Sequence, residues 1–583
     1  MEDRRMKAYR AQAAGKIPAD LVLNHCRLVN VLSGEIEEDV TIAICGDEIV
    51  GIGADYVGKE TVDVGGKYVY PALVDAHIHL ESTKLTITEA ARLMSRNGTG
   101  TVITDPHEIA NVCGLDGIAY QMDAASDNGR INVFFTVPSC VPALPDPNVE
   151  TFGALLGPSK LRIFHDHPWV VALGEMMNVP GILMEDDKVI RKIESFMETG
   201  KTIDGHAPML GGQALNAYIY AGIDSDHEST TCAEAIEKVR RGMDIMIREG
   251  SSERNLDAVL PAVNDGNASR FMFASDDLDP SDLMRRGHIN HLVARAVKAG
   301  LSPIRALQMA TIHPARHFHL YPRLGAIRPG ARADLVIAED LVDFVPNDVM
   351  HGGVFVFRDG REMPAGRCVP RYLRPAMNVR LPEVEALAVA AKEGHRIHLI
   401  DMVPGQILTQ EAVETPTVVD HYVVPDAEKG IAKVCVFERH HASSAFGMGF
   451  VRGFGMKCGA MGSSVGHDSH NIVVVGMNDD DILRCAKLIR DNNGGQAAVL
   501  GEMREVLPLP IAGLMSPETA ENVVFTEHRL DAFCAEKLGV TLERPMAALS
   551  FMSLPVIPNI RITDQGLFRV APGAYPLKIS LFD

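Results

Sequence analysis

The opening part of the chain combines a polar stretch with short alternating runs. Residues 1–18 are mostly polar and predict a helix. From 20–69, Val, Ile and Leu alternate with polar residues, and Gly- or Asn-rich turns divide the runs, as is typical of β-strands. Runs of the same kind return far downstream, between 324 and 363. We expect the two flanks, 1–70 and 321–375, to form one small β-sandwich domain interrupted by a large insertion.

The insertion, residues 71–320, has a different rhythm, because apolar strand-like runs alternate with helical stretches. Eight such units in about 250 residues match the size of a (β/α)8 barrel. The sequence therefore predicts an α/β fold with a central barrel. The eight runs are YPALVDAHIHL, GTVITDPHE, INVFFTVPS, VVALGEMM, KTIDGHAP, YAGIDSDHE, DIMIREGS and RFMFASDD.

The remaining residues, 376–583, change the pattern once more. Segments with the pattern of β-strands, such as KGIAKVCVFER and NIVVVGM, alternate with segments that have the pattern of a helix, such as DDDILRCAKLIRDN. We expect a separate C-terminal α+β domain here.

Side chains of the types that bind metals recur where the predicted barrel strands end. In a barrel of parallel strands these ends share one face, which is where active sites form. Residues two apart in a strand point the same way, so His77 and His79 can grip one ion. Neutral imidazoles with carboxylates suit Zn, Fe or Mn. The strand-end residues are His77, His79, His107, Glu108, Glu175, His206, His227 and Asp276.

A single His at a strand end is more often a polar turn residue than a ligand, and only the recurrence favours a metal site. A polar string in the C-terminal part, residues 466–471 (GHDSHN), stays open between two interpretations. It either caps the apolar strand that follows or lines the active site.

Composition and charge narrow the classes of partner. The 583 residues carry a net charge of −20, which disfavours binding to a phosphate backbone or an anionic membrane. No apolar run is long enough to span a membrane, and the polar start does not resemble a secretory signal. Ten scattered cysteines without a C-x-x-C pair are typical of reduced, cytoplasmic proteins. We expect a cytoplasmic enzyme that binds neither nucleic acid nor membrane.

Several strings in the chain identify a family. The V-D-A-H-I-H run and the G-A-R-A-D-L-V run resemble the amidohydrolase superfamily. The D-P-H-E-I-A-N-V and H-D-S-H-N strings are longer and more specific, and they resemble the bacterial adenine deaminase family. The resemblance extends over nearly the whole chain after residue 20. The strings lie at residues 74–79, 79–82, 104–114, 205–208, 330–336 and 464–471.

The resemblance implies a binuclear divalent metal centre in the barrel, with Mn or Fe favoured and Zn also compatible. Many relatives bridge the two metals with a carboxylated Lys. The fourth strand run here offers Glu175 and no Lys, which fits the adenine deaminase branch better than a cyclic amidase. The residues that match the family's ligands are His77, His79, Glu175, His206, His227 and Asp276.

The resemblance further implies an adenine aminohydrolase, in which a metal-activated hydroxide attacks C6 of adenine and ammonia leaves. Asp276 would take the proton of the attacking water and pass it to the leaving group. Glu108 is the candidate for protonating N1, with Glu81 the weaker alternative; Glu108 could instead only orient His107 or cap a helix. We expect Glu81, His107, Ser275 and His467 to contact the substrate.

Two alternatives to adenine deamination as the function remain open at this stage. The chain could be a related amidohydrolase acting on another purine or a cyclic amide, or a catalytically silent barrel used for assembly. It lacks the P-C-x-x-C string that cytidine and tRNA-adenosine deaminases combine with H-x-E, so that class is excluded. A role in purine salvage or adenine catabolism and a homodimer or larger homo-oligomer are expected.

Overall fold

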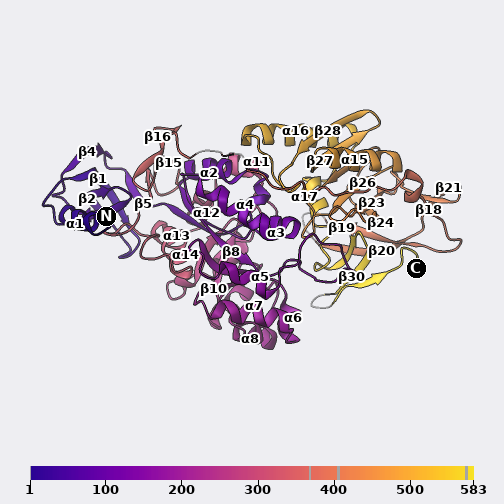
Figure 1. Ribbon diagram of the computed structural model, residues 1–583, viewed down its shortest axis with the longest axis horizontal. Coiled ribbons are helices and arrows are strands. Elements are labelled where there is room, and N and C mark those ends of the chain that lie inside the picture. Colours follow the sequence, from indigo (N-terminus) through magenta and orange to yellow (C-terminus); the bar gives the residue numbers. More distant parts are fainter. Residues whose placement is uncertain (1, 367–368, 370, 404–407, 572–574) are drawn as a thin grey trace.

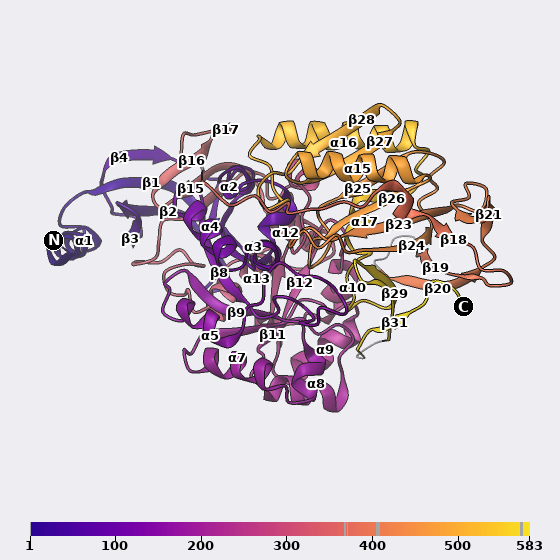
Figure 2. The same cartoon turned by 45° about the vertical axis from the view of Figure 1, so that its right-hand side comes forward.

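The computed structural model describes residues 2–366, 369, 371–403, 408–571 and 575–583. The molecule is elongated, with the chain ends near opposite tips (Figure 1). The N-terminal sheet lies at one tip, the barrel in the middle and the C-terminal elements at the other tip, and a rotated view keeps this order (Figure 2). The polar lead forms helix α1 (Glu2–Ala13), as predicted. Among the described residues, no helix combines the length and apolar character needed to cross a bilayer.

Both flanks of the barrel contribute strands to one sheet. Antiparallel pairing of β5 with β14 joins the flanks, with Leu335 opposite Pro71. Backbone hydrogen bonds also connect Ile49 of β3 to Gly330 and Ala331, so the sheet curls around an apolar interior. The predicted small β domain is therefore a single curled sheet rather than two separate ones. Its strands are β1 (Ala19–Asn30), β2 (Glu35–Cys45), β3 (Glu48–Ile52), β4 (Gly58–Asp63), β5 (Tyr68–Pro71), β14 (Leu335–Ala338), β15 (Pro346–His351), β16 (Val354–Arg358) and β17 (Arg361–Glu362).

All eight predicted barrel runs form strands. Two parallel sheets, β6 to β10 and β11 to β13, follow one another in chain order. The amide of Asp276 donates to the carbonyl of His77 (2.9 Å), and the amide of Asp224 donates to that of Ile203 (2.8 Å), so both gaps between the sheets are bridged. The strands are β6 (Leu73–Ile78), β7 (Thr99–Thr104), β8 (Asn132–Pro138), β9 (Val170–Met176), β10 (Thr202–Gly205), β11 (Ser225–Asp226), β12 (Asp244–Arg248) and β13 (Phe271–Ala274).

Helices cover the outside of the barrel strands. In the first long one, Ile87, Ala90, Ala91 and Met94 recur at three- and four-residue spacing and are buried, which turns one face to the strands. The helices are α2 (Ile87–Arg96), α3 (His107–Cys113), α4 (Leu115–Ser126), α5 (Pro158–Leu161), α6 (Val179–Leu183), α7 (Asp187–Met197), α8 (Gly212–Tyr220), α9 (Cys232–Arg240), α10 (Leu256–Val259), α11 (Pro280–Arg286), α12 (Ile289–Lys298), α13 (Pro303–Met309) and α14 (Ile312–His317).

The C-terminal part is built on an eight-stranded sheet in the order β20-β19-β24-β23-β26-β25-β27-β28. Two three-stranded sheets and three helices accompany it, which matches the predicted α+β character. The strands are β18 (Val389–Ala390), β19 (Ile397–Met402), β20 (Thr409–Glu414), β21 (Thr417–Val419), β22 (Tyr422–Val424), β23 (Ile431–Phe437), β24 (Phe446–Arg452), β25 (Ala460–Ser463), β26 (Ile472–Gly476), β27 (Gly495–Leu500), β28 (Met503–Pro508), β29 (Asn559–Thr563), β30 (Gly566–Val570) and β31 (Leu577–Ile579); the helices are α15 (Asp479–Asp491), α16 (Ala520–Lys537) and α17 (Pro545–Ser550).

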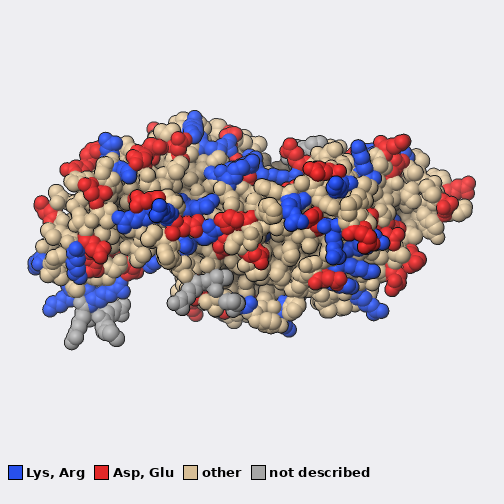
Figure 3. Space-filling model, turned by 90° about the horizontal axis from the view of Figure 1, so that it is seen from above, with Lys and Arg blue, Asp and Glu red and all other residues tan. Residues whose placement is uncertain are grey.

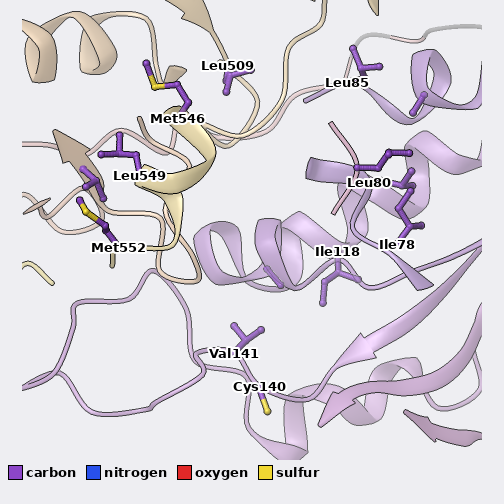
Figure 4. Packing of buried hydrophobic residues seen from close by; sticks show 14 of the residues in the cluster. Ile78, Leu80, Leu85, Ile118, Cys140, Val141, Leu509, Met546, Leu549 and Met552 are labelled. Atoms are coloured by element: carbon purple, nitrogen blue, oxygen red, sulfur yellow. The ribbon is translucent and has the colours of Figure 1, made fainter. Parts of the chain in front are cut away.

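The C-terminal part packs tightly on the barrel. One continuous cluster of buried apolar side chains contains residues of both parts. Figure 4 shows Leu80 and Leu85, which follow β6, on the barrel side and Met546 and Leu549 of α17 on the other. Because the loop after β6 begins beside the barrel's strand ends, this packing brings the C-terminal part to the face where the predicted ligands lie.

A buried group of one His and two carboxylates joins α14 to the barrel strands β10 and β12, and its removal should lower the stability of the protein. His317 Nε2 lies 3.0 Å from Asp204 Oδ1, and its Nδ1 lies 2.9 Å from Asp244 Oδ2. Burial alone would lower the pKa of His317, but the two carboxylates raise it to about 10. We expect His317→Ala to lower the melting temperature markedly, since removing one partner of a buried ion pair costs about 3 kcal/mol or more.

The sign of the pH dependence follows from the raised pKa of His317. The stabilisation is complete below the ordinary pKa of His, about 6.5, and is lost as the pH rises toward 10. The difference in melting temperature between wild type and His317→Ala should therefore shrink from pH 6.5 to pH 10. His528→Ala, at an exposed position of α16, is the matched control. A pH-independent difference would contradict this assignment.

Candidate metal centre

The predicted ligands converge at the carboxyl ends of the barrel strands. Each lies among the last two residues of a strand or within two residues after it. The parallel arrangement therefore brings them to one face of the barrel. All but one are almost completely buried; His206 is partly exposed. Together they offer four imidazoles and two carboxylates. They are His77 (β6), His79 (after β6), Glu175 (β9), His206 (after β10), His227 (after β11) and Asp276 (after β13).

One half of the cluster gathers around the first strand. The Nε2 atoms of His77 and His79 lie 3.2 Å apart. His79 Nε2 lies 3.2 Å from Asp276 Oδ1 and 3.6 Å from Glu175 Oε1. Ligand atoms of a tetrahedral ion with bonds of ~2.0–2.1 Å are about 3.3 Å apart, so these spacings suit a single cation.

The other half gathers on the second oxygen of Glu175. Glu175 Oε2 lies 2.7 Å from His206 Nδ1 and 2.7 Å from His227 Nε2. Glu175 therefore directs one oxygen to each group, as a bridging ligand does. The donor atoms of His77, His79 and Glu175 lie within 4.8 Å of one another, and so do those of Glu175, His206 and His227.

The electrostatics of Glu175 agree with a ligand role. Burial alone would raise its pKa, but His227 and His206 bring it well below its usual value, so the carboxyl is ionised. A buried carboxylate surrounded by imidazoles is a donor set that Zn, Fe and Mn accept. We conclude that the residues fit a divalent metal centre.

Supporting hydrogen bonds orient the ligands. His79 Nδ1 lies 3.0 Å from the carbonyl of Asp105, which leaves Nε2 for a metal. Ser275 occupies a similar supporting place. Its hydroxyl donates to Asp75, and Asp75 also accepts from the amide of His77. The substrate contact expected for Ser275 stays a prediction.

Two charged residues at the site escaped the sequence prediction. Arg248, the last residue of β12, contacts both Asp276 Oδ2 and Glu228 Oε1 through Nη1. Burial alone would raise the pKa of Asp276, but Arg248 and His79 hold it well below its usual value. A strand-end position, the signal that identified the ligands, could have pointed to Arg248 as well.

Glu108 lies in the first turn of α3, and three imidazoles contact its carboxylate. His467 Nδ1 is 2.7 Å and His107 Nε2 is 3.2 Å from its Oε1, and His470 Nε2 contacts its Oε2. Burial alone would raise the pKa of Glu108, but these imidazoles bring it well below its usual value. The lowered pKa indicates an ionised Glu108, because its neighbours are potential cations.

Glu81, the weaker candidate for N1, has the environment expected of a neutral acid. It lies in the short helical turn after β6 (Leu80–Thr83), and burial raises its pKa to about 7. Its Oε1 accepts from the amide of Ile109 (3.2 Å), while its buried Oε2 has no hydrogen-bond partner among the described residues.

The open question about the GHDSHN string is answered by its contacts. The string lies between β25 and β26, and His467 and His470 both reach Glu108 of the barrel. The Asp468 carboxylate lies within 4.8 Å of donor atoms of His107 and Glu108. The C-terminal part therefore contributes side chains next to the metal centre.

Comparison with known proteins agrees with this arrangement. Residues 68–356, which include all eight barrel strands, match the amidohydrolase family. Residues 406–573 match the adenine deaminase C-terminal domain. The chain is 43% identical to the adenine deaminase of Desulfatibacillum aliphaticivorans over 565 residues, which cover 96% of this chain and 97% of that protein. It is also 43% identical, over 96% of its length, to adenine deaminase 2 of Carboxydothermus hydrogenoformans and to the adenine deaminase of Methanothrix thermoacetophila, each covered over 97%. The chain belongs to the adenine deaminase family.

Proposed function

We propose that the chain hydrolyses adenine to hypoxanthine and ammonia. The observation that carries this proposal is the complete ligand set around Glu175 in a chain 43% identical to adenine deaminases over nearly its whole length. An assembly protein with a silent barrel has no need to retain all six ligand residues.

We further propose a binuclear centre held by His77, His79 and Asp276 on one side and by His206 and His227 on the other, with Glu175 between them. Mn or Fe is the favoured occupant, and Zn is compatible with the same ligands. Divalent cations there would lower the pKa of a water molecule, so that hydroxide is available near neutral pH.

In this proposal Asp276 moves the protons of the reaction. It takes a proton from the attacking water and gives it to the leaving amine. Its Oδ1 faces His77 and His79, while Arg248 holds its Oδ2 from the other side. The contact with Arg248 fixes the orientation of the carboxylate.

Attack at C6 drives electron density onto N1, which must gain a proton. We propose that Glu108, with its imidazole partner His107, handles that proton, and that Glu81 is the alternative. Since Glu108 is ionised but contacts imidazoles, the proton would come from this hydrogen-bonded group rather than from an isolated neutral acid.

Exchanging each carboxyl for an amide separates the two candidates. We expect Glu108→Gln to lower kcat by about 10²-fold or more at unchanged metal content, because an amide cannot relay a proton. Glu81→Gln should lower kcat by less. The check is kcat, metal content and melting temperature for both variants; a normal kcat in metal-replete Glu108→Gln, with a large loss in Glu81→Gln, would transfer the role to Glu81.

The substrate proposal is tested with a panel of free purines, pyrimidines and hydantoins, following ammonia release. Adenine should be the best substrate by kcat/KM. A clear preference for another purine or a cyclic amide would replace the proposal with the related hydrolase. No turnover of any compound by protein with two bound metals would favour a silent barrel.

The setting of the enzyme is also proposed. A reducing cytoplasm fits the nine described cysteines, all free, and a role in purine salvage or adenine catabolism fits the reaction.

On the face shown in Figure 3, acidic and basic side chains are interspersed, which suits a small uncharged substrate better than nucleic acid. We propose a homodimer or larger homo-oligomer; light scattering would measure the mass.

A further inference from the structure

The loop between β25 and β26 reaches from the C-terminal part to the first turn of α3. His470, at its end, is completely buried and contacts Glu108 Oε2. His467 reaches the other oxygen of the same carboxylate at 2.7 Å. Two side chains of the C-terminal part therefore hold both oxygens of one barrel residue.

The backbone of the loop fixes which nitrogen of His470 carries the proton. The amide of Gly466 donates to His470 Nδ1 (3.2 Å), so Nδ1 is an acceptor. The proton of the ring then resides on Nε2, which faces Glu108. His470 is also in the left-handed region (φ 55°), a conformation that a non-glycine residue adopts only when its surroundings enforce it.

The same loop is anchored to a second barrel loop. Asn471 Nδ2 donates to the carbonyl of Thr151 (2.8 Å), and Thr151 donates through its hydroxyl to Asp564 (2.6 Å). Thr151 lies in the long segment between β8 and β9, so the loop between β25 and β26 contacts the segments that follow two neighbouring strands, β7 and β8. Its position relative to Glu108 is set by the fold.

A continuous set of contacts leads from this loop to the metal centre. Glu108 Oε1 lies 3.2 Å from His107 Nε2, and the opposite nitrogen of His107 lies 3.6 Å from Glu175 Oε1. The rings of His107 and His79 are 4.5 Å apart, centroid to centroid. His107 already lies beside Glu175, so a shift of Glu108 would displace His107 relative to Glu175.

We infer that His470 is a positioning residue of the active site, which acts through Glu108 on His107. The C-terminal domain is then a working part of the catalytic machinery and not only a structural addition. This inference rests on the proposed function, because its effect is measured on adenine turnover.

The test uses the full-length, metal-loaded enzyme and three single variants. His470→Asn removes the imidazole but tolerates the left-handed backbone better than other residues. His470→Gln keeps a donor of similar reach. The matched control is His441→Gln. His441 also belongs to the C-terminal part and contacts the barrel, but at the carbonyl of Phe152 and not at Glu108.

We expect His470→Asn to lower kcat by about 10-fold or more with little change in KM and in metal content. His470→Gln should recover part of the loss, and His441→Gln should stay within about 2-fold of wild type. A wild-type kcat for His470→Asn would overturn the inference.

A double-mutant cycle with Glu108→Gln separates positioning from general loosening of the structure. If His470 acts through Glu108, His470→Asn should cost less than about 2-fold in kcat/KM when Glu108 is already Gln, since residues in one network are not additive. Losses that multiply fully would overturn the inference, even if His470→Asn is less stable. The wild-type rate tells the two failures apart: an active wild type with multiplying losses refutes only the role of His470, whereas an inactive one refutes the proposed function.

Discussion

Exchanging Glu175 for Gln should empty the metal centre and abolish turnover. Glu175 directs one oxygen to His79 and the other to His206 and His227, so its charge serves both halves of the site. An amide offers only one oxygen, which is neutral, and the surrounding imidazoles would lose their counter-charge. We expect the metal content to fall from about two to below one per chain and kcat to drop at least ~10³-fold, since metal activation is worth several kcal/mol.

The matched control for this exchange is Glu198→Gln, at an exposed position just after α7. It should leave metal content and kcat unchanged. Metal content by elemental analysis and turnover of adenine are measured on both proteins. A Glu175→Gln protein that holds two metals and turns over normally would show that Glu175 is not the bridging ligand.

The second large effect is expected for Asp276→Asn. The amide keeps the size of the side chain and one oxygen for a metal, but it cannot carry a proton from water to the leaving amine. We predict a loss of at least ~10²-fold in kcat, the low end for general acid–base catalysis. The contact with Arg248 should weaken too, because a neutral amide replaces the carboxylate.

Metal content decides how the Asp276→Asn result is interpreted. A metal-replete variant with low kcat supports the proton-transfer role, whereas loss of metal would make Asp276 chiefly a ligand. Near-normal turnover at full metal content would remove Asp276 from the proton-transfer role. Arg248→Gln, measured in parallel, tests whether the orientation of Asp276 matters; we expect a smaller loss than for Asp276→Asn.

The barrel was predictable because its eight strands are local features of the sequence. Each run of apolar residues is followed by polar residues. In a parallel barrel the carboxyl ends of the strands lie on one face, so these polar residues meet there. His206 and His227 could thus be placed beside Glu175 without any structure. The flanking β domain was predictable for the same reason, since its alternating runs return on both sides of the insertion.

What sequence reasoning missed depends on contacts between distant parts of the chain. No local pattern shows that a loop more than 350 residues after Glu108 supplies its partners His467 and His470, so the ionised state of Glu108 could not be foreseen. The bond from the Ser275 hydroxyl to Asp75 joins residues 200 positions apart, so it too could not be read from the local pattern. Arg248 was overlooked because Arg is not a metal-ligand type.

The most direct test of the central claim is a metal titration of the metal-free protein, with conversion of adenine to hypoxanthine followed at each addition. We predict no conversion without metal and a rate that rises to a plateau at two equivalents of Mn²⁺ or Fe²⁺ per chain. Full conversion by the metal-free protein, or none at any metal loading, would contradict it.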